Sequence, residues 1–76
     1  MPLYAFSFID RYMFDPLTEE WLPNDEAAKR EAVLVAEDLD QRNKVRPIAE
    51  RYNGVLVVKK ADREIVRLII GSNRTR

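Results

Sequence analysis

The chain has 76 residues, 46% of them hydrophobic, and its 13 basic and 13 acidic side chains give a net charge of zero. It contains no Cys and no His, which excludes disulfides, thiolate zinc sites, histidine metal ligands and Ser-His or Cys-His catalysis. A chain this short buries only about 60% of its unfolded surface, so we expect one small domain without a deep active site.

The N-terminal segment has the pattern of a β-hairpin. Aromatic side chains alternate with others over residues 4–9, which predicts a strand that turns its aromatic side to the core. A reversal at residues 10–11 leads into a second strand from residue 12. Residues 15–18, which begin with an Asp-Pro pair, predict a turn or bulge, because Pro has no amide hydrogen to donate. Residues 19–22 either continue this strand or form an extended loop.

A helix is predicted over residues 25–42. Asn24 or Asp25 can cap its first turn by accepting hydrogen bonds from free backbone amides. We expect it to end near Asn43, since Asn tolerates a left-handed cap. One face carries small and aliphatic side chains at helical spacing and would pack on a sheet: Ala28, Ala32, Val35, Ala36 and Leu39.

The C-terminal half is predicted to contain a second hairpin, with strands at residues 55–60 and 64–70 joined by a short loop. Residues 47–52 either form a short second helix that begins at Pro47 or are a linker. In the last strand we expect two faces, one formed by Val66, Leu68 and Ile70 and the other by Ile65, Arg67 and Ile69.

Two hairpins that flank a helix predict an α+β domain. We expect an antiparallel sheet of about four strands in the order β-β-α-(α)-β-β, with one long helix packed on one face. The domain would span residues 1–71, with residues 72–76 as a frayed basic tail. The sequence shows neither an apolar run of membrane-spanning length nor a secretory signal pattern, so we expect a cytoplasmic protein.

Opposite charges are concentrated in opposite halves of the chain. Residues 1–38 hold three basic and nine acidic side chains, whereas residues 39–76 hold ten basic and four acidic ones. This asymmetry indicates a charged partner, a self-associating chain, or halves that neutralise each other within the fold. A candidate basic patch for phosphate binding, or alternatively a solvated strand edge, is formed by Lys59, Lys60, Arg63, Arg67, Arg74 and Arg76.

A second candidate surface is aromatic. If the first strand turns its aromatic side inward, Tyr12, Phe14 and Trp21 are left to face outward, where they would suit a protein interface. The alternative is that they belong to the core, as aromatic side chains of small domains usually do.

Acidic side chains near the first hairpin are candidate magnesium ligands. Asp10, Asp15, Glu19 and Glu20 carry the oxygen ligands that Mg²⁺ prefers, but their spacing matches no known metal loop. We therefore expect no metal, no cofactor and no catalytic residues, and keep a metal-dependent hydrolase only as a remote alternative.

The opening Met1-Pro2-Leu3-Tyr4-Ala5-Phe6, with the step Leu22-Pro23-Asn24-Asp25-Glu26-Ala27-Ala28 into the helix, resembles a family of short uncharacterised bacterial proteins of unknown function. The resemblance covers about residues 1–40. It departs at Asp10-Arg11, where family members usually have Asp-Gly, and in residues 43–53. It implies a β-β-α start and a bacterial or phage origin, and it implies no activity.

Together these observations favour a small non-enzymatic protein-interaction module, a regulator or inhibitor that occupies the surface of a partner. We expect a protein partner, with a homodimer as one form of it. The alternative is a nucleic-acid-binding module that uses the basic C-terminal hairpin and tail.

Overall fold

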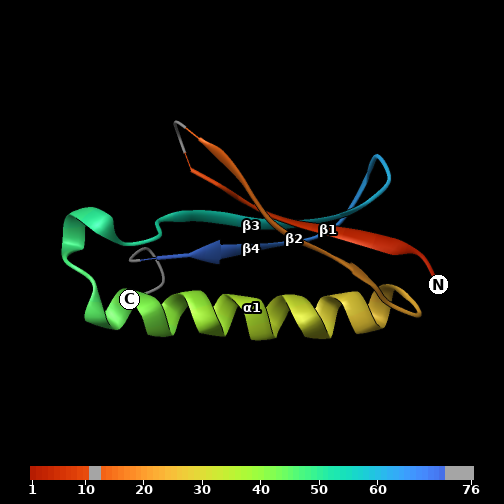
Figure 1. Cartoon of the computed structure of the whole chain (residues 1–76), viewed down its shortest axis with the longest axis horizontal. Helices are drawn as coiled ribbons and strands as arrows, with labels where there is room; N and C mark the ends of the chain where they lie inside the picture. The colour runs from red at the N-terminus through yellow and green to blue at the C-terminus, as the bar shows by residue number, and fades with distance from the viewer. Residues whose placement is uncertain (11–12, 72–76) are drawn as a thin grey trace.

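The computed structural model describes residues 1–10 and 13–71, apart from the side chain of Ile48. The predicted α+β fold is confirmed, with the elements β1 (Leu3–Ile9), β2 (Phe14–Trp21), α1 (Asp25–Val45), a 3₁₀ turn (Ile48–Glu50), β3 (Gly54–Lys60) and β4 (Arg63–Ile70). The strands form one sheet in the order β2-β1-β3-β4, and each neighbouring pair is antiparallel. Helix α1 runs along one side of this sheet, closest to β4 and β3 (Figure 1).

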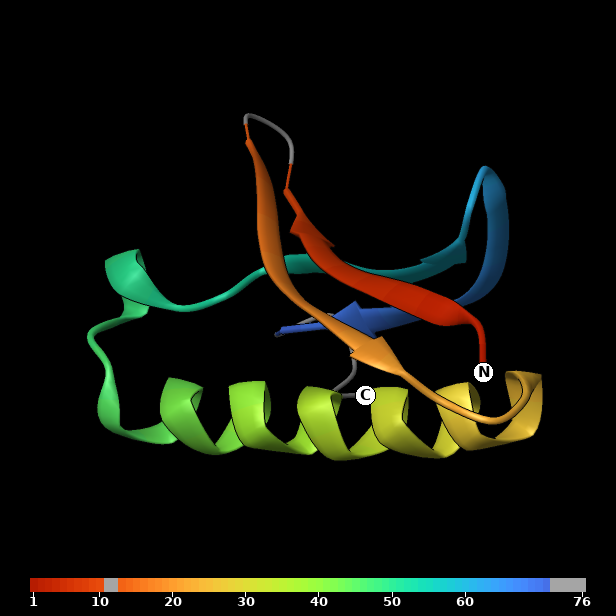
Figure 2. The same cartoon turned by 45° about the vertical axis from the view of Figure 1, so that its right-hand side comes forward.

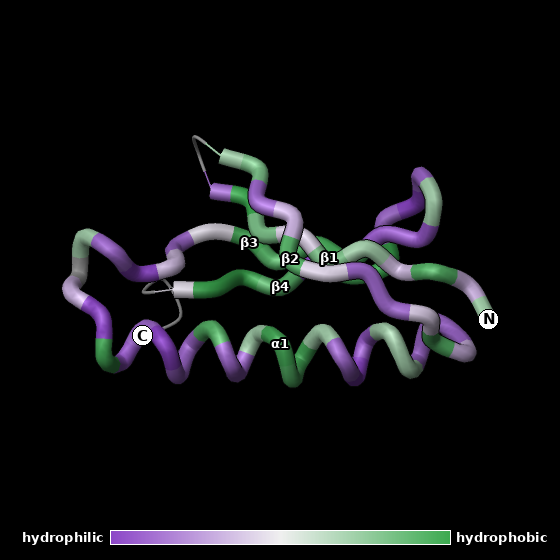
Figure 3. Tube along the Cα trace, in the orientation of Figure 1, coloured by the Kyte–Doolittle hydropathy of each residue, from purple (hydrophilic) through white to green (hydrophobic). Residues whose placement is uncertain are grey.

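The core lies between α1 and the sheet. The predicted aromatic side of β1 is buried, with Tyr4 and Phe6 fully enclosed and Phe8 nearly so. The alanine face of α1 packs against them, because small side chains allow the helix to approach the strands closely. Figure 3 shows the hydrophobic stretches of β3 and β4 running alongside the helix. The buried set is completed by Ala28, Ala32, Ala36, Leu39, Leu56, Val58 and Ile70.

Helix α1 begins as predicted but ends later. The side chain of Asn24 accepts a hydrogen bond from the amide of Ala27 at 2.9 Å, which makes Asn24 the N-cap. The expected end near Asn43 is wrong, since the helix continues to Val45. The Asn43 side chain instead makes two hydrogen bonds to the backbone of Tyr52, so it ties the following loop to the helix.

The segment after α1 contains one short 3₁₀ turn and no second α-helix. Only Ile48–Glu50 forms a 3₁₀ turn within the predicted residues 47–52. The loop is anchored by Tyr52, whose ring meets the Phe8 ring edge-on at 5.3 Å between centroids. The Arg46 guanidinium lies 5.1 Å from the same ring.

Strand β2 runs through the Asp-Pro pair. The alternative of a turn at residues 15–18 is wrong, and the alternative of a bulge is confirmed: Phe6 pairs with Thr18 and Ser7 with Pro16, which leaves Leu17 as the extra residue. Pro16 is tolerated because β2 is an edge strand, where one side of the backbone needs no ladder partner. The bulged Leu17 is partly buried against the core.

A second bulge corrects the predicted faces of β4. Val58 pairs with Val66 and Lys59 with Glu64, so Ile65 is the extra residue there. Ile65 therefore packs against the core together with Val66, and it does not share the face of Arg67 and Ile69 as expected.

Candidate interaction surface

The sheet has helix α1 on one side only, and the opposite side is here named the open face. Figure 2 shows the β1–β2 and β3–β4 hairpins rising away from the helix on this side. Residues paired across antiparallel strands share a face, so the registers assign the side chains. The open face carries Leu3, Ala5, Ser7 and Ile9 of β1, Phe14, Pro16, Glu19 and Trp21 of β2, Val55, Val57 and Lys59 of β3, and Glu64, Arg67 and Ile69 of β4.

One row of the open face is apolar on all four strands. Ile9 pairs with Phe14 on one side and with Val55 on the other, and Val55 pairs with Ile69. The outer two side chains of this row are the most accessible, since Phe14 is 63% and Ile69 57% exposed. At a strand spacing of about 4.8 Å, the row is roughly 14 Å wide.

A second apolar group stands at the other end of the open face. Trp21 pairs with Leu3 and is 64% exposed. Phe14 and Trp21 are seven residues apart, a separation that would place them on opposite sides of a regular strand. The extra residue of the β2 bulge restores the alternation, so both aromatic side chains stand on the open face.

Small side chains lie between the two apolar ends. Ala5 and Ser7 lie under a shallow depression of about 370 Å³. Phe14, Pro16 and Glu19 are among the residues that line it from β2. The open face is therefore low in the middle of β1 and raised at both ends.

The charged side chains of the open face differ in how they are compensated. Arg67 donates two hydrogen bonds to the Glu64 carboxylate, at 3.1 and 2.8 Å. These bonds lower the pKa of Glu64 and raise that of Arg67. Lys59 pairs with Glu64 across β3 and β4, and its charge also lowers the pKa of Glu64. In the described part of the chain, Glu19 forms no ion pair.

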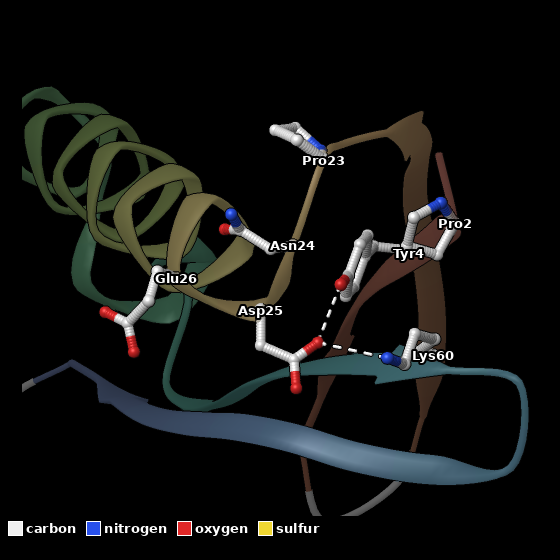
Figure 4. A pocket seen from close by; sticks show the side chains of 7 residues that line it. All are labelled: Pro2, Tyr4, Pro23, Asn24, Asp25, Glu26 and Lys60. Atoms are coloured by element: carbon white, nitrogen blue, oxygen red, sulfur yellow. Dashed lines mark hydrogen bonds and ion pairs between the residues drawn. The ribbon is translucent and has the colours of Figure 1, made fainter.

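Two residues of the candidate basic patch are turned to the helix. The Lys60 ammonium lies 3.3 Å from one oxygen of the Asp25 carboxylate, and the Arg63 guanidinium lies 3.6 Å from the other. The Tyr4 hydroxyl donates a hydrogen bond of 2.6 Å to the same carboxylate. Figure 4 shows Tyr4 and Lys60 converging on Asp25 beside the start of α1.

This cluster changes the protonation of its members. The hydrogen bond from Tyr4 lowers the pKa of Asp25, and the neighbouring cations add to the effect. Burial raises the pKa of Tyr4 to about 12, helped by its bond to the carboxylate. Asp25 belongs to the acidic half of the chain and both cations to the basic half, so part of the charge asymmetry is neutralised within the fold.

The structure does not gather all the predicted site residues. Phe14 and Trp21 are brought to one face, whereas Tyr12, Arg74 and Arg76 lie outside the described residues. Among the residues that are described, no group of three or more acidic side chains is arranged to hold a metal ion. The contribution of Ile9, Val55 and Ile69 to this face is not visible in the sequence, because it depends on the strand registers.

Comparison with known proteins gives this chain no family: no family model, curated protein or solved structure matches it. The resemblance of its first 40 or so residues to uncharacterised bacterial proteins stays a prediction. Within residues 1–10 and 13–71, no helix has the length and apolar character needed to cross a membrane.

Proposed function

We propose that this chain is a non-enzymatic protein-interaction module of the cytoplasm that binds through the open face of its sheet. The observation that carries the proposal is the exposure of Phe14 and Trp21 on this one face, together with the apolar row in which Phe14 lies beside Ile9, Val55 and Ile69. Large rigid side chains of this kind bury much area on binding while few rotatable bonds are frozen.

The chemistry of the face supports binding more than turnover. It combines aromatic and aliphatic side chains with a few charged ones, which is the composition of a protein interface. Such a module acts as a regulator or inhibitor by covering the surface of its partner. Charge on the partner would steer the encounter more than it would add affinity.

The alternative of nucleic-acid binding stays a prediction with weaker support. Of its four described basic residues, Lys60 and Arg63 are paired with Asp25 and Arg67 is paired with Glu64. Cations that already face carboxylates contribute less to phosphate binding, because an existing ion pair must be given up.

Site-specific photocrosslinking tests the proposed surface. A photoreactive amino acid replaces Phe14 in the purified chain, which is then irradiated in a lysate of its source cells. The matched control places the same group at Val33, which is 47% exposed on the outer side of α1. We expect a discrete crosslinked protein species from position 14 and none from position 33. Equal or absent crosslinking from both positions would contradict the proposal.

A further inference from the structure

The β2 side of the open face combines exposed aromatic rings with uncompensated negative charge. We propose that it binds an arginine of the protein partner, whose guanidinium is held between the Glu19 carboxylate and the Trp21 ring. The inference rests on the proposed function and names the chemistry of the partner segment that the open face binds. It is carried by the placement of these two side chains and by the charge around them.

Glu19 and Trp21 are neighbours on the open face. Glu19 pairs with Ala5 and Trp21 with Leu3, which are alternate residues of β1 on this face. Alternate residues of a strand lie about 7 Å apart, so one side chain of a partner can reach both. Glu19 is exposed, and Trp21 is 64% exposed. The strand therefore presents a carboxylate beside an accessible indole ring.

The charge of β2 has a single sign. The strand contains the acidic side chains Asp15, Glu19 and Glu20 and no basic side chain. None of these carboxylates forms an ion pair within the part of the chain that the structure describes. Covering the Glu19 carboxylate without an opposite charge would be unfavourable. A partner segment that lies over this side of the open face is therefore expected to carry a cation.

The pair of groups suits a guanidinium better than an ammonium. A guanidinium donates two parallel hydrogen bonds to a carboxylate, and its flat surface stacks on an aromatic ring. An ammonium is a compact charge that holds its water more strongly and has no flat surface to stack. Trp attracts cations more strongly than the other aromatic side chains do. The expected cation is therefore an arginine.

The depression beside Glu19 suits an apolar side chain of the same partner segment. It has a volume of about 370 Å³, and the residues that β2 contributes to its lining run from Phe14 to Glu19. Its lining from β1 includes the small residues Ala5 and Ser7. In an extended segment, alternate side chains point to the same side, so an apolar residue and an arginine separated by one residue would both face the sheet.

Peptide titrations followed by the amide chemical shifts of the purified full chain test the arginine site. The probe is acetyl-leucyl-glycyl-arginine amide, and two matched peptides carry citrulline or lysine in place of the arginine. We expect the arginine peptide to cause shifts that saturate in the millimolar range and are largest at Ala5, Glu19 and Trp21. Citrulline has nearly the same shape without the charge, so its peptide should bind roughly fivefold more weakly or worse. The lysine peptide should also bind more weakly than the arginine peptide.

Variants of β2 test the two groups separately. Glu19→Gln removes the carboxylate charge and should weaken binding of the arginine peptide roughly fivefold or more. The matched control is Glu20→Gln, which removes the same charge from the next residue, on the helix side of the strand opposite Tyr4, and should leave binding unchanged. Trp21→Leu should weaken binding and reduce the preference for arginine over lysine. Thermal unfolding of each variant verifies that it is folded.

The outcomes separate the inference from the proposed function. Equal binding of the arginine and citrulline peptides, or no saturable binding of any peptide, would overturn the arginine site. Equal losses in Glu19→Gln and Glu20→Gln would also overturn it, because they would show only a general effect of charge. In each of these cases the proposed function still stands if position 14 crosslinks to another protein, and it fails if position 14 crosslinks to nothing.

Discussion

The Tyr4 hydroxyl donates a 2.6 Å hydrogen bond to the Asp25 carboxylate, and this contact joins the first strand to the start of the helix. Lys60 and Arg63 reach the same carboxylate from the ends of β3 and β4. One side chain therefore connects the N-terminal strand, the helix and the C-terminal hairpin. The pH dependence of stability should report on this connection.

In acid, the Asp25 cluster should lose its contribution to stability. The pKa of Asp25 in the folded chain lies below its ordinary value of 3.8, so the contribution is present above that pH and is lost as the pH falls through the folded pKa. We expect Asp25→Asn to lower the free energy of unfolding at pH 7. The difference from wild type should shrink between about pH 4 and pH 2. Urea unfolding over this range measures it.

The control for this experiment is Glu26→Gln, which removes a more exposed carboxylate from the same helical turn. It should cost less stability than Asp25→Asn at pH 7. If the difference in free energy of unfolding between wild type and Asp25→Asn stays constant down to pH 2, the Asp25 charge does not stabilise the fold.

The Tyr4 hydroxyl should lose its proton at a higher pH than an ordinary tyrosine. Its pKa in the folded chain is about 12, compared with an ordinary value of 10.0. Its contribution to the free energy of unfolding is therefore fully present below pH 10 and is lost as the pH rises through 12. Ultraviolet absorbance of tyrosinate should show a step near pH 12 that Tyr4→Phe lacks. A titration whose high-pH part is the same in both chains would contradict the buried, hydrogen-bonded hydroxyl.

The alanine face of α1 should not accept larger side chains. Ala32 is fully buried against the sheet, and Ala32→Leu is expected to destabilise the chain by about 1–3 kcal/mol through overpacking. Val33→Leu is the matched control one residue away, on the exposed side, and should change stability by less than about 0.5 kcal/mol. Similar urea midpoints for the two variants would show that α1 does not pack on the sheet through Ala32.

Nucleic-acid binding by the last hairpin should be weak. Lys60, Arg63 and Arg67 already face carboxylates, so labelled mixed-sequence DNA and RNA should show little fluorescence anisotropy change at physiological salt. Micromolar binding with a steep salt dependence, lost when these three residues and Lys59 are changed to Ala, would instead support the basic patch.

The sequence predicted the elements well because periodicity is a local property. Tyr4, Phe6 and Phe8 alternate at strand spacing, and the alanines of α1 recur at helical spacing, so the sequence alone indicates both buried faces. The bulge in β4 was not predicted, since it depends on the partner strand, and its one extra residue reverses the face of the residues that follow. For this reason Ile65 was assigned to the wrong face.

The candidate surface was only half visible in the sequence. Phe14 and Trp21 stood out as aromatic residues beyond the needs of the core, but the open face also depends on which strands are neighbours. Ile9, Val55 and Ile69 come from three strands whose order no local pattern specifies. The pairing of Asp25 with Lys60 was hidden for the same reason, because the two residues meet only through the sheet.

Fluorescence of Trp21 tests most directly whether the open face associates. It is the only Trp of the chain, it is 64% exposed, and it stands on the open face. If a protein partner covers this face, the emission maximum should move to shorter wavelength when the partner crosslinked from position 14 is added, and Phe14→Ser should suppress the shift. An emission maximum that stays that of a water-exposed Trp at saturating partner would contradict binding through the open face.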